Sequence, residues 1–111
     1  MAAEKLSPAA VPTLMTGLGL AEALAETGDT ASANRVLDEV AAQLAPKVGL
    51  PHGVLARTQA VTLLREGRTV EARAALDRAA AIFTSLGASG APYLKTLPPL
   101  RKRLQATAIS R

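Results

Sequence analysis

The chain has 111 residues, of which 49% are hydrophobic but only 2% aromatic, and its formal net charge is +4. A chain of this length forms one domain. Ala and Leu supply most of the apolar content and favour helix over strand, so we expect an all-α fold. The absence of cysteine excludes a disulfide framework and a thiolate metal site, and fits a cytoplasmic protein.

The N-terminal part predicts a loose segment followed by a first helix. Residues 1–11 are expected to be a flexible lead-in, and residues 12–111 a single helical domain. The first helix is predicted over residues 13–27. Gly28 then supplies the permissive backbone that a tight turn needs.

The middle of the chain predicts two more helices. Asp29 or Thr30 is expected to cap the second helix, because short polar side chains accept hydrogen bonds from free N–H groups at a helix start. Pro46 should end that helix. Pro51 suits the first turn of a third helix, which is predicted to reach Glu66.

The C-terminal part predicts a fourth helix and a final interrupted one. Gly67 turns the chain, Thr69 is expected to cap, and the fourth helix should run to about Leu86. A fifth helical segment is predicted over residues 92–109, kinked or restarted by the adjacent residues Pro98 and Pro99. We therefore expect about five helices.

Two stretches share one layout of small residues, large apolar residues and a glycine. Their matching positions are Ala21, Leu24, Gly28, Ala33 and Leu37 in the first, and Ala60, Leu63, Gly67, Ala72 and Leu76 in the second. Such an internal repeat is typical of helical hairpin arrays, which mostly bind other molecules.

This pattern resembles the tetratricopeptide repeat, although the two turn glycines are 39 residues apart against that family's usual ~34. Repeat one would cover residues 14–46, repeat two residues 51–86, and a capping segment residues 91–109. The loose Ala/Leu/Arg-rich repeats, with Leu86-Gly87 after the fourth helix, are similar to the helical tails of bacterial transcriptional regulators. The resemblance implies a short right-handed array with a regulatory or assembly role.

The resemblance also implies a concave face lined by the first helix of each repeat, where a partner peptide or amphipathic helix binds. We expect there an apolar floor between an acidic side and a basic side. The residues expected on this face are Met15, Leu18, Glu22 and Glu26 from the first helix, Val54, Arg57, Val61, Leu64 and Arg65 from the third, and Leu94, Arg101 and Lys102 from the last segment. The alternative is that these apolar side chains pack against neighbouring helices or a second copy.

Self-association is a further expectation, because a short array exposes apolar residues at its ends unless they are capped. The residues expected to be exposed in this way are Leu14, Leu18, Leu100 and Leu104. Burying them against another copy predicts a homodimer or a fold that depends on a partner.

Two other functions stay open. The basic run Arg101-Lys102-Arg103, with Lys95, predicts contact with nucleic-acid phosphates, although almost no aromatic residue is available for base stacking. The same charges are typical of a solvated helix surface, where pairs such as Arg73 with Asp77 are expected. A small-ligand pocket between helices, as in a ligand-sensing regulator, is the second alternative.

Catalysis has no sequence support. His52 is the only histidine and has no nucleophile or second ligand at a suitable spacing. Gly17-Leu18-Gly19 follows no predicted strand, so it is not a phosphate loop. We expect no enzymatic activity, no cofactor and no metal. No apolar run has the length of a membrane span.

Overall fold

The protein is all-α, as predicted, in a computed structural model that describes residues 11–44 and 46–109. The predicted lead-in lies outside the described residues except for Val11, which begins the first helix. The elements in chain order are α1 (Val11–Glu26), α2 (Thr30–Gln43), α3 (Leu50–Arg65), α4 (Thr69–Ser85), the 3₁₀ turn η2 (Gly87–Ser89), α5 (Ala91–Leu94) and α6 (Leu97–Ile109).

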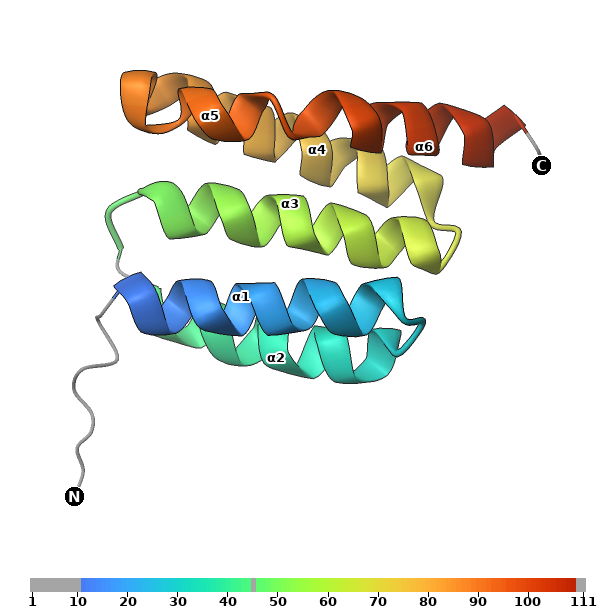
Figure 1. The fold of residues 1–111 in the computed structure, drawn as a ribbon, viewed down its shortest axis with the longest axis horizontal. Coiled ribbons are helices and arrows are strands. Elements are labelled where there is room, and N and C mark those ends of the chain that lie inside the picture. The colour runs from blue at the N-terminus through green and yellow to red at the C-terminus, as the bar shows by residue number, and fades with distance from the viewer. Residues whose placement is uncertain (1–10, 45, 110–111) are drawn as a thin grey trace.

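The helices form two layers (Figure 1). One layer holds α1, α3 and the α5–α6 segment side by side, and the other holds α2 and α4. Helix α1 pairs with α2 and α3 pairs with α4 as antiparallel hairpins, while α6 lies against α4 and α3. Helix α3 is therefore central, and the α1–α2 hairpin and the α5–α6 segment form the two free edges of the stack.

The two hairpins turn in the same way. Gly28 and Gly67 occupy the left-handed region, at φ +96° and +77°, which residues with a Cβ adopt only under strain. In each turn the N–H after the glycine closes the helix end by bonding a carbonyl five residues earlier. These bonds run from Asp29 N–H to Leu24 O at 2.9 Å and from Arg68 N–H to Leu63 O at 2.9 Å.

The helix starts agree with the sequence at α2 and differ at α4. Asp29 caps α2 as predicted, because its Oδ1 accepts the Ser32 N–H at 3.1 Å. This backbone hydrogen bond lowers the pKa of the Asp29 carboxyl because it stabilises the charged form. The prediction that Thr69 caps α4 is wrong: Thr69 is already helical and Arg68 holds the cap position without a side-chain cap bond.

The last predicted helix is divided in two. The break falls at Lys95 and Thr96, ahead of the prolines, so Pro98 and Pro99 stand in the first turn of α6. Proline is tolerated there because the first N–H groups of a helix have no partner within it. The prolines thus help to start α6.

Small residues lie where the helices cross. Ala21, Ala33, Ala60 and Ala72 are all fully buried, which lets the backbones of paired helices approach closely. Two polar side chains of the central helix, Thr58 and Thr62, are also buried. The Thr58 hydroxyl donates a hydrogen bond to the Val54 carbonyl at 2.8 Å, and the Thr62 hydroxyl donates one to the Thr58 carbonyl at 3.0 Å.

The expectation that apolar residues are exposed at the ends of the array is wrong. Leu14, Leu18, Leu100 and Leu104 are all buried in the core of the chain itself. Helix α6 covers the open side of α3 and α4, and α1 packs on α2 and α3. The physical reason given for a homodimer through these four residues therefore does not hold.

One aromatic side chain is held especially closely. Phe83 of α4 is fully buried and its ring stacks on Tyr93 with centroids 5.3 Å apart. A Cβ added to Gly53 of α3 would lie 2.4 Å from this ring, and one added to Gly90 would lie 2.0 Å from the Phe83 carbonyl oxygen. The two glycines leave the room that Phe83 occupies.

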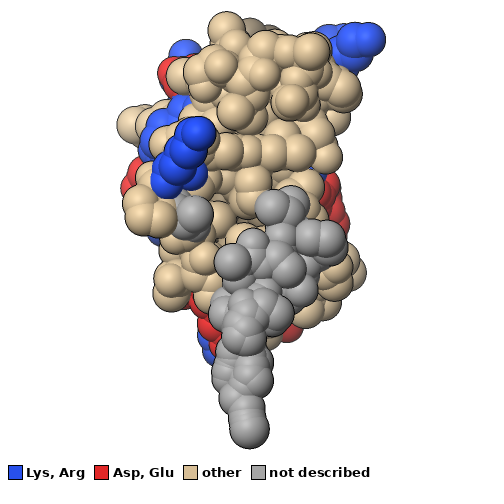
Figure 2. Space-filling model, turned by 90° about the vertical axis from the view of Figure 1, so that its left-hand side faces the viewer, with Lys and Arg blue, Asp and Glu red and all other residues tan. Residues whose placement is uncertain are grey.

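Charge is unevenly distributed along the helix axes. Residues 11–21, 40–56 and 79–100 contain only two charged side chains, Lys47 and Lys95. These segments meet at the end of the stack opposite the two glycine turns. Figure 2 faces that end and shows mostly uncharged surface in its described part. The charged side chains gather toward the glycine turns.

Candidate interaction surfaces

The predicted apolar floor is mostly inside the protein. Leu18, Val54 and Leu64 are buried, and Val61 is 0% exposed. These side chains pack between neighbouring helices, which was the alternative interpretation of the pattern. Met15 and Leu94 are half-buried against the same core. A partner cannot touch the four buried residues in this conformation.

The acidic and basic residues of the predicted face contact each other. Glu22 of α1 accepts a hydrogen bond from the Arg57 guanidinium of α3 at 2.7 Å. The side chains in this pair are 32% and 16% exposed, so it is better shielded from water than an ordinary surface pair. The Arg57 Nε is buried and has no acceptor among the described residues.

A second group of contacts joins the end of α1 to α3 and α6. Arg65 donates to the carbonyls of Ala25, at 3.0 Å, and of Glu26. Carbonyls in the last turn of a helix lack intrahelical partners, although that of Ala25 also accepts the Gly28 N–H at 3.0 Å, and positive charge at a helix C-terminus is favourable. Arg103 of α6 reaches the Glu26 carboxylate at 3.0 Å. Sequence analysis placed Glu26 and Arg65 on one face but did not predict Arg103 as a partner.

The basic cluster of α6 is also partly paired. Arg101 bonds Asp77 of α4 at 3.1 Å, so Asp77 pairs with a different helix instead of with Arg73 on its own. Lys102 is exposed and forms no ion pair within the described residues. The predicted face therefore consists of paired charges over a buried floor and does not form an open groove between two charged sides.

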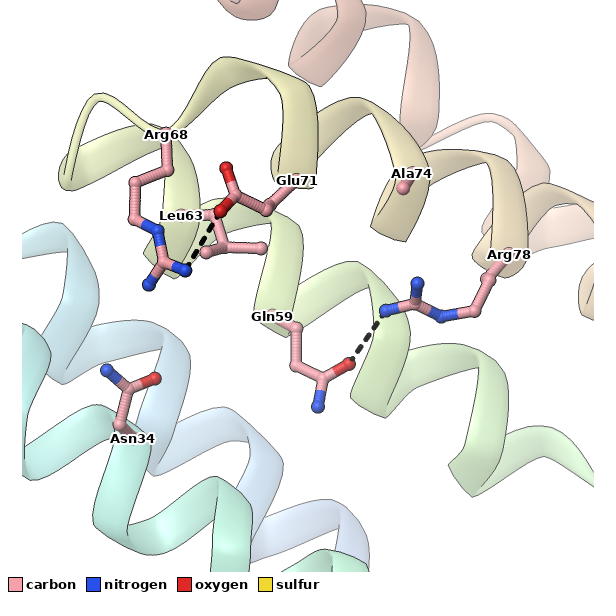
Figure 3. Close-up of a pocket in the computed structure, with 7 residues that line it drawn as sticks. All are labelled: Asn34, Gln59, Leu63, Arg68, Glu71, Ala74 and Arg78. Atoms are coloured by element: carbon pink, nitrogen blue, oxygen red, sulfur yellow. Dashed lines mark hydrogen bonds and ion pairs between the residues drawn. The ribbon is translucent and has the colours of Figure 1, made fainter.

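An open groove lies in the other layer, between α2 and α4 and above α3 (Figure 3). We call it the α2–α4 groove, and its volume is about 340 Å³. The residues that line it are Asn34 from α2, Gln59 and Leu63 from α3, Arg68 from the turn, and Glu71, Ala74 and Arg78 from α4.

At the turn end of the groove the positive charge of Arg68 is offset by two carboxylates, which leaves a net charge of −1. Arg68 bonds the carboxylates of Glu71 at 3.0 Å and Glu66 at 3.5 Å. The Arg68 hydrogen bond lowers the pKa of Glu71, and Glu71 in turn raises the pKa of Arg68. Asn34 of α2 donates to the Glu66 carboxylate at 3.3 Å. These side chains already partner one another.

The other end of the groove carries positive charge. Arg78 forms no ion pair within the described residues, and it donates one long hydrogen bond, 3.4 Å, to the Gln59 side-chain oxygen. A guanidinium has five N–H donors. Arg78 therefore keeps donors for an incoming group.

Sequence analysis missed this groove. Gln59 and Leu63 are four residues apart on α3, and Glu71, Ala74 and Arg78 share one face of α4, so each set follows helical spacing. The spacing within one helix does not reveal the gap between α2 and α4. That gap exists because α3 separates them.

Comparisons with protein-family models, curated proteins and solved structures gave no match to this chain. Within the described parts of the chain, no group of His, Asp and Glu side chains could hold a metal ion. None of the described helices combines the length and apolar character needed to cross a bilayer.

Proposed function

We propose that the chain is a protein-interaction module related to the tetratricopeptide repeat, which binds an extended segment of a partner protein in the α2–α4 groove. The observation that carries the proposal is the groove itself, whose lining presents carboxamide and guanidinium groups above a small apolar floor. The two equivalent glycine turns support the repeat interpretation.

The chemistry of the lining suits a peptide backbone. The side chains of Asn34 and Gln59 carry the same amide group as the main chain, with both a donor and an acceptor. They lie on different helices along the groove, so an extended segment could pair its N–H and C=O groups with both. Side chains of an extended segment point alternately to opposite sides, and Leu63 and Ala74 offer apolar contact to one that points into the groove.

The charge of the lining predicts which charge the bound segment carries beside Arg78. Because Arg68 is neutralised and Arg78 is not, a carboxylate of the partner binds favourably beside Arg78. Charge-assisted hydrogen bonds to arginine are stronger than neutral ones. We therefore expect the preferred peptides to carry Asp, Glu or a free C-terminus at one end.

Panning of a random peptide library against the purified chain tests this function. The groove variant combines Gln59→Ala with Arg78→Ala. The matched control is Arg73→Ala, which removes an exposed arginine of the same helix that does not line the groove. We expect enriched acidic peptides that bind the parent and the control alike, and bind the groove variant at least about tenfold more weakly, or ~1.4 kcal/mol.

The proposal is wrong if no peptide is enriched on the parent, or if enriched peptides bind the groove variant as tightly as the control. Circular dichroism of all three proteins verifies that they remain equally helical. Changes at Val61 or Leu64 are unsuitable for this test, because both residues belong to the core.

A small-ligand site is the second candidate function. The groove volume of about 340 Å³ is within the range of small-molecule pockets, about 300–1,000 Å³, at its lower end. A carboxylate compound beside Arg78 would then raise the melting temperature of the parent and leave that of Arg78→Ala unchanged.

The nucleic-acid alternative is less favoured, because Arg101 and Arg103 are engaged with carboxylates. Gel retardation of a generic duplex at low salt, lost on Lys102→Glu, would support it. The resemblance to the helical tails of bacterial regulators extends our proposal to a regulatory role in a bacterial cytoplasm.

A further inference from the structure

The two free edges of the stack carry opposite charge. Residues 11–43, which contain the α1–α2 hairpin, have five acidic residues and one basic residue, a net of −4. Residues 69–109, which contain α4 to α6, have six basic residues and two acidic ones, a net of +4. Figure 1 places these two segments on opposite sides of α3. The chain is therefore electrically polar along the direction in which its helices stack.

Part of this charge is paired in contacts within the chain. Glu22 and Glu26 are bonded by arginines of α3 and α6, and Asp77 is bonded by Arg101. What remains at each edge decides what a second molecule would meet.

The exposed charged side chains without an ion pair in the described structure leave a net charge of −2 on the α1–α2 hairpin, from Asp29, Arg35, Asp38 and Glu39, and of +2 on the α5–α6 segment, from Lys95 and Lys102. On α2 the adjacent residues Asp38 and Glu39, which we call the acidic edge, follow Arg35 by about one turn. At the end of α5 and on α6 lie Lys95 and Lys102, which we call the basic edge. Each pair lies on the side of its element that faces away from the core.

We propose that copies of this chain associate head to tail, with the acidic edge of one copy docked on the basic edge of the next. Contact between two acidic edges or two basic edges places like charges together and is repulsive, whereas unlike edges attract. A contact between two different surfaces of identical chains does not close into a symmetric dimer, so the array can grow beyond two copies.

The α1–α2 hairpin, which carries the acidic edge, also presents apolar surface to the solvent. Leu20 of α1 is 53% exposed, and a Cβ added to its neighbour Gly19 would meet nothing within 4 Å. On the other side, Pro98 and Pro99 are exposed beside Lys102. Docking the α1–α2 hairpin of one copy on the α5–α6 segment of the next would continue the row of helices that the hairpins already form. This proposal does not depend on the α2–α4 groove.

Sedimentation velocity of the full chain tests the association. We expect the weight-average mass to exceed the monomer mass of 11.4 kDa as the concentration rises from about 10 µM to about 1 mM, since association follows mass action. Raising the salt from about 0.05 M to about 0.5 M should weaken it, because screening shortens the range of exposed charges.

Charge reversal provides the sharper test. The acidic-edge variant, Asp38→Lys with Glu39→Lys, has two basic edges, and the basic-edge variant, Lys95→Glu with Lys102→Glu, has two acidic edges. Each variant alone should remain monomeric where the parent associates. An equimolar mixture of the two should associate again, because unlike edges are then present.

A single change of equal size supplies the control. Lys102→Glu and Arg35→Glu each alter the net charge by two units at an exposed position, but Arg35 lies on α2 beside the acidic edge. We expect Lys102→Glu to weaken association and Arg35→Glu to preserve it. A parent that stays monomeric throughout, or an association that survives both edge reversals, overturns the proposal.

Discussion

Replacement of Gly53 by alanine probes the closest packing in the core. An ideal Cβ at Gly53 lies 2.4 Å from Cε1 and 2.8 Å from Cδ1 of Phe83, whereas non-bonded carbons prefer about 3.5–4.0 Å. The ring cannot easily move away, because Phe83 is fully buried and stacks on Tyr93. Gly90 also confines its backbone.

The magnitude follows from two opposing effects. Overpacking of a core costs about 1–3 kcal/mol, and alanine gains about 1 kcal/mol over glycine in helix propensity. Since the contact at Gly53 is severe, we place the steric cost at the upper end and expect a net loss of about 1–2 kcal/mol. For a domain of this size that lowers Tm by roughly 5–10 °C.

Thermal unfolding followed by circular dichroism measures this loss. Gly19→Ala in α1 is the matched control, since its new Cβ meets nothing within 4 Å, and it should raise Tm through helix propensity alone. In a protein that already carries Phe83→Leu, Gly53→Ala should lower the stability by less than it does in the parent, because the smaller side chain leaves room for the new Cβ. If Gly53→Ala melts at or above the parent temperature, the packing of α3 on α4 described above is incorrect.

Three further predictions concern the hairpins. Ala72→Leu should destabilise the fold by about 1–3 kcal/mol, because Ala72 is fully buried at a close helix crossing; an unchanged urea midpoint would contradict this. Gly67→Ala should cost about 1 kcal/mol, because the residue has φ +77° and side chains disfavour that region; Gly49→Ala, with φ −149°, is the control and should show little loss. The lowered pKa of Asp29, caused by the Ser32 N–H, contributes stability that is fully present above the unfolded-state pKa of about 3.9 and is lost as pH falls through the lower folded-state value. Asp29→Asn should abolish that part of the pH dependence of the unfolding free energy in urea titrations. If the variant loses stability at low pH as the parent does, the prediction is wrong.

The hairpins could be predicted from the sequence because their determinants are local. Gly28 and Gly67 supply the left-handed backbone, and the Asp29 carboxylate caps the helix that follows, so neighbouring residues decide each turn. The start of α4 was misplaced by one residue, since the bond from Arg68 N–H closes the preceding turn and leaves Thr69 already helical.

The surfaces could not be predicted in the same way, because they depend on distant parts of the chain. Val61 has the spacing of a surface stripe on α3, yet its burial depends on the helices packed around α3. The contact of Glu26 with Arg103 joins residues 77 positions apart, and no helical period links them. The groove beside Arg78 likewise exists only once α2 and α4 are placed on α3.

The stepwise stacking of the helices has a consequence for how the chain folds. Most helix pairs in contact are neighbours in the sequence, as in α1 with α2 and α3 with α4, and such local topologies fold on the order of microseconds to milliseconds. During synthesis the α1–α2 hairpin emerges first, but the hydrogen bonds that Arg65 donates to the carbonyls of Ala25 and Glu26 can form only after α3 has been made. The ion pair between the Glu26 carboxylate and Arg103 can form only later, after α6 has been made. Among the described helices α6 is the last to be synthesised, so the contact between Glu26 and Arg103 is the last of these contacts that can form.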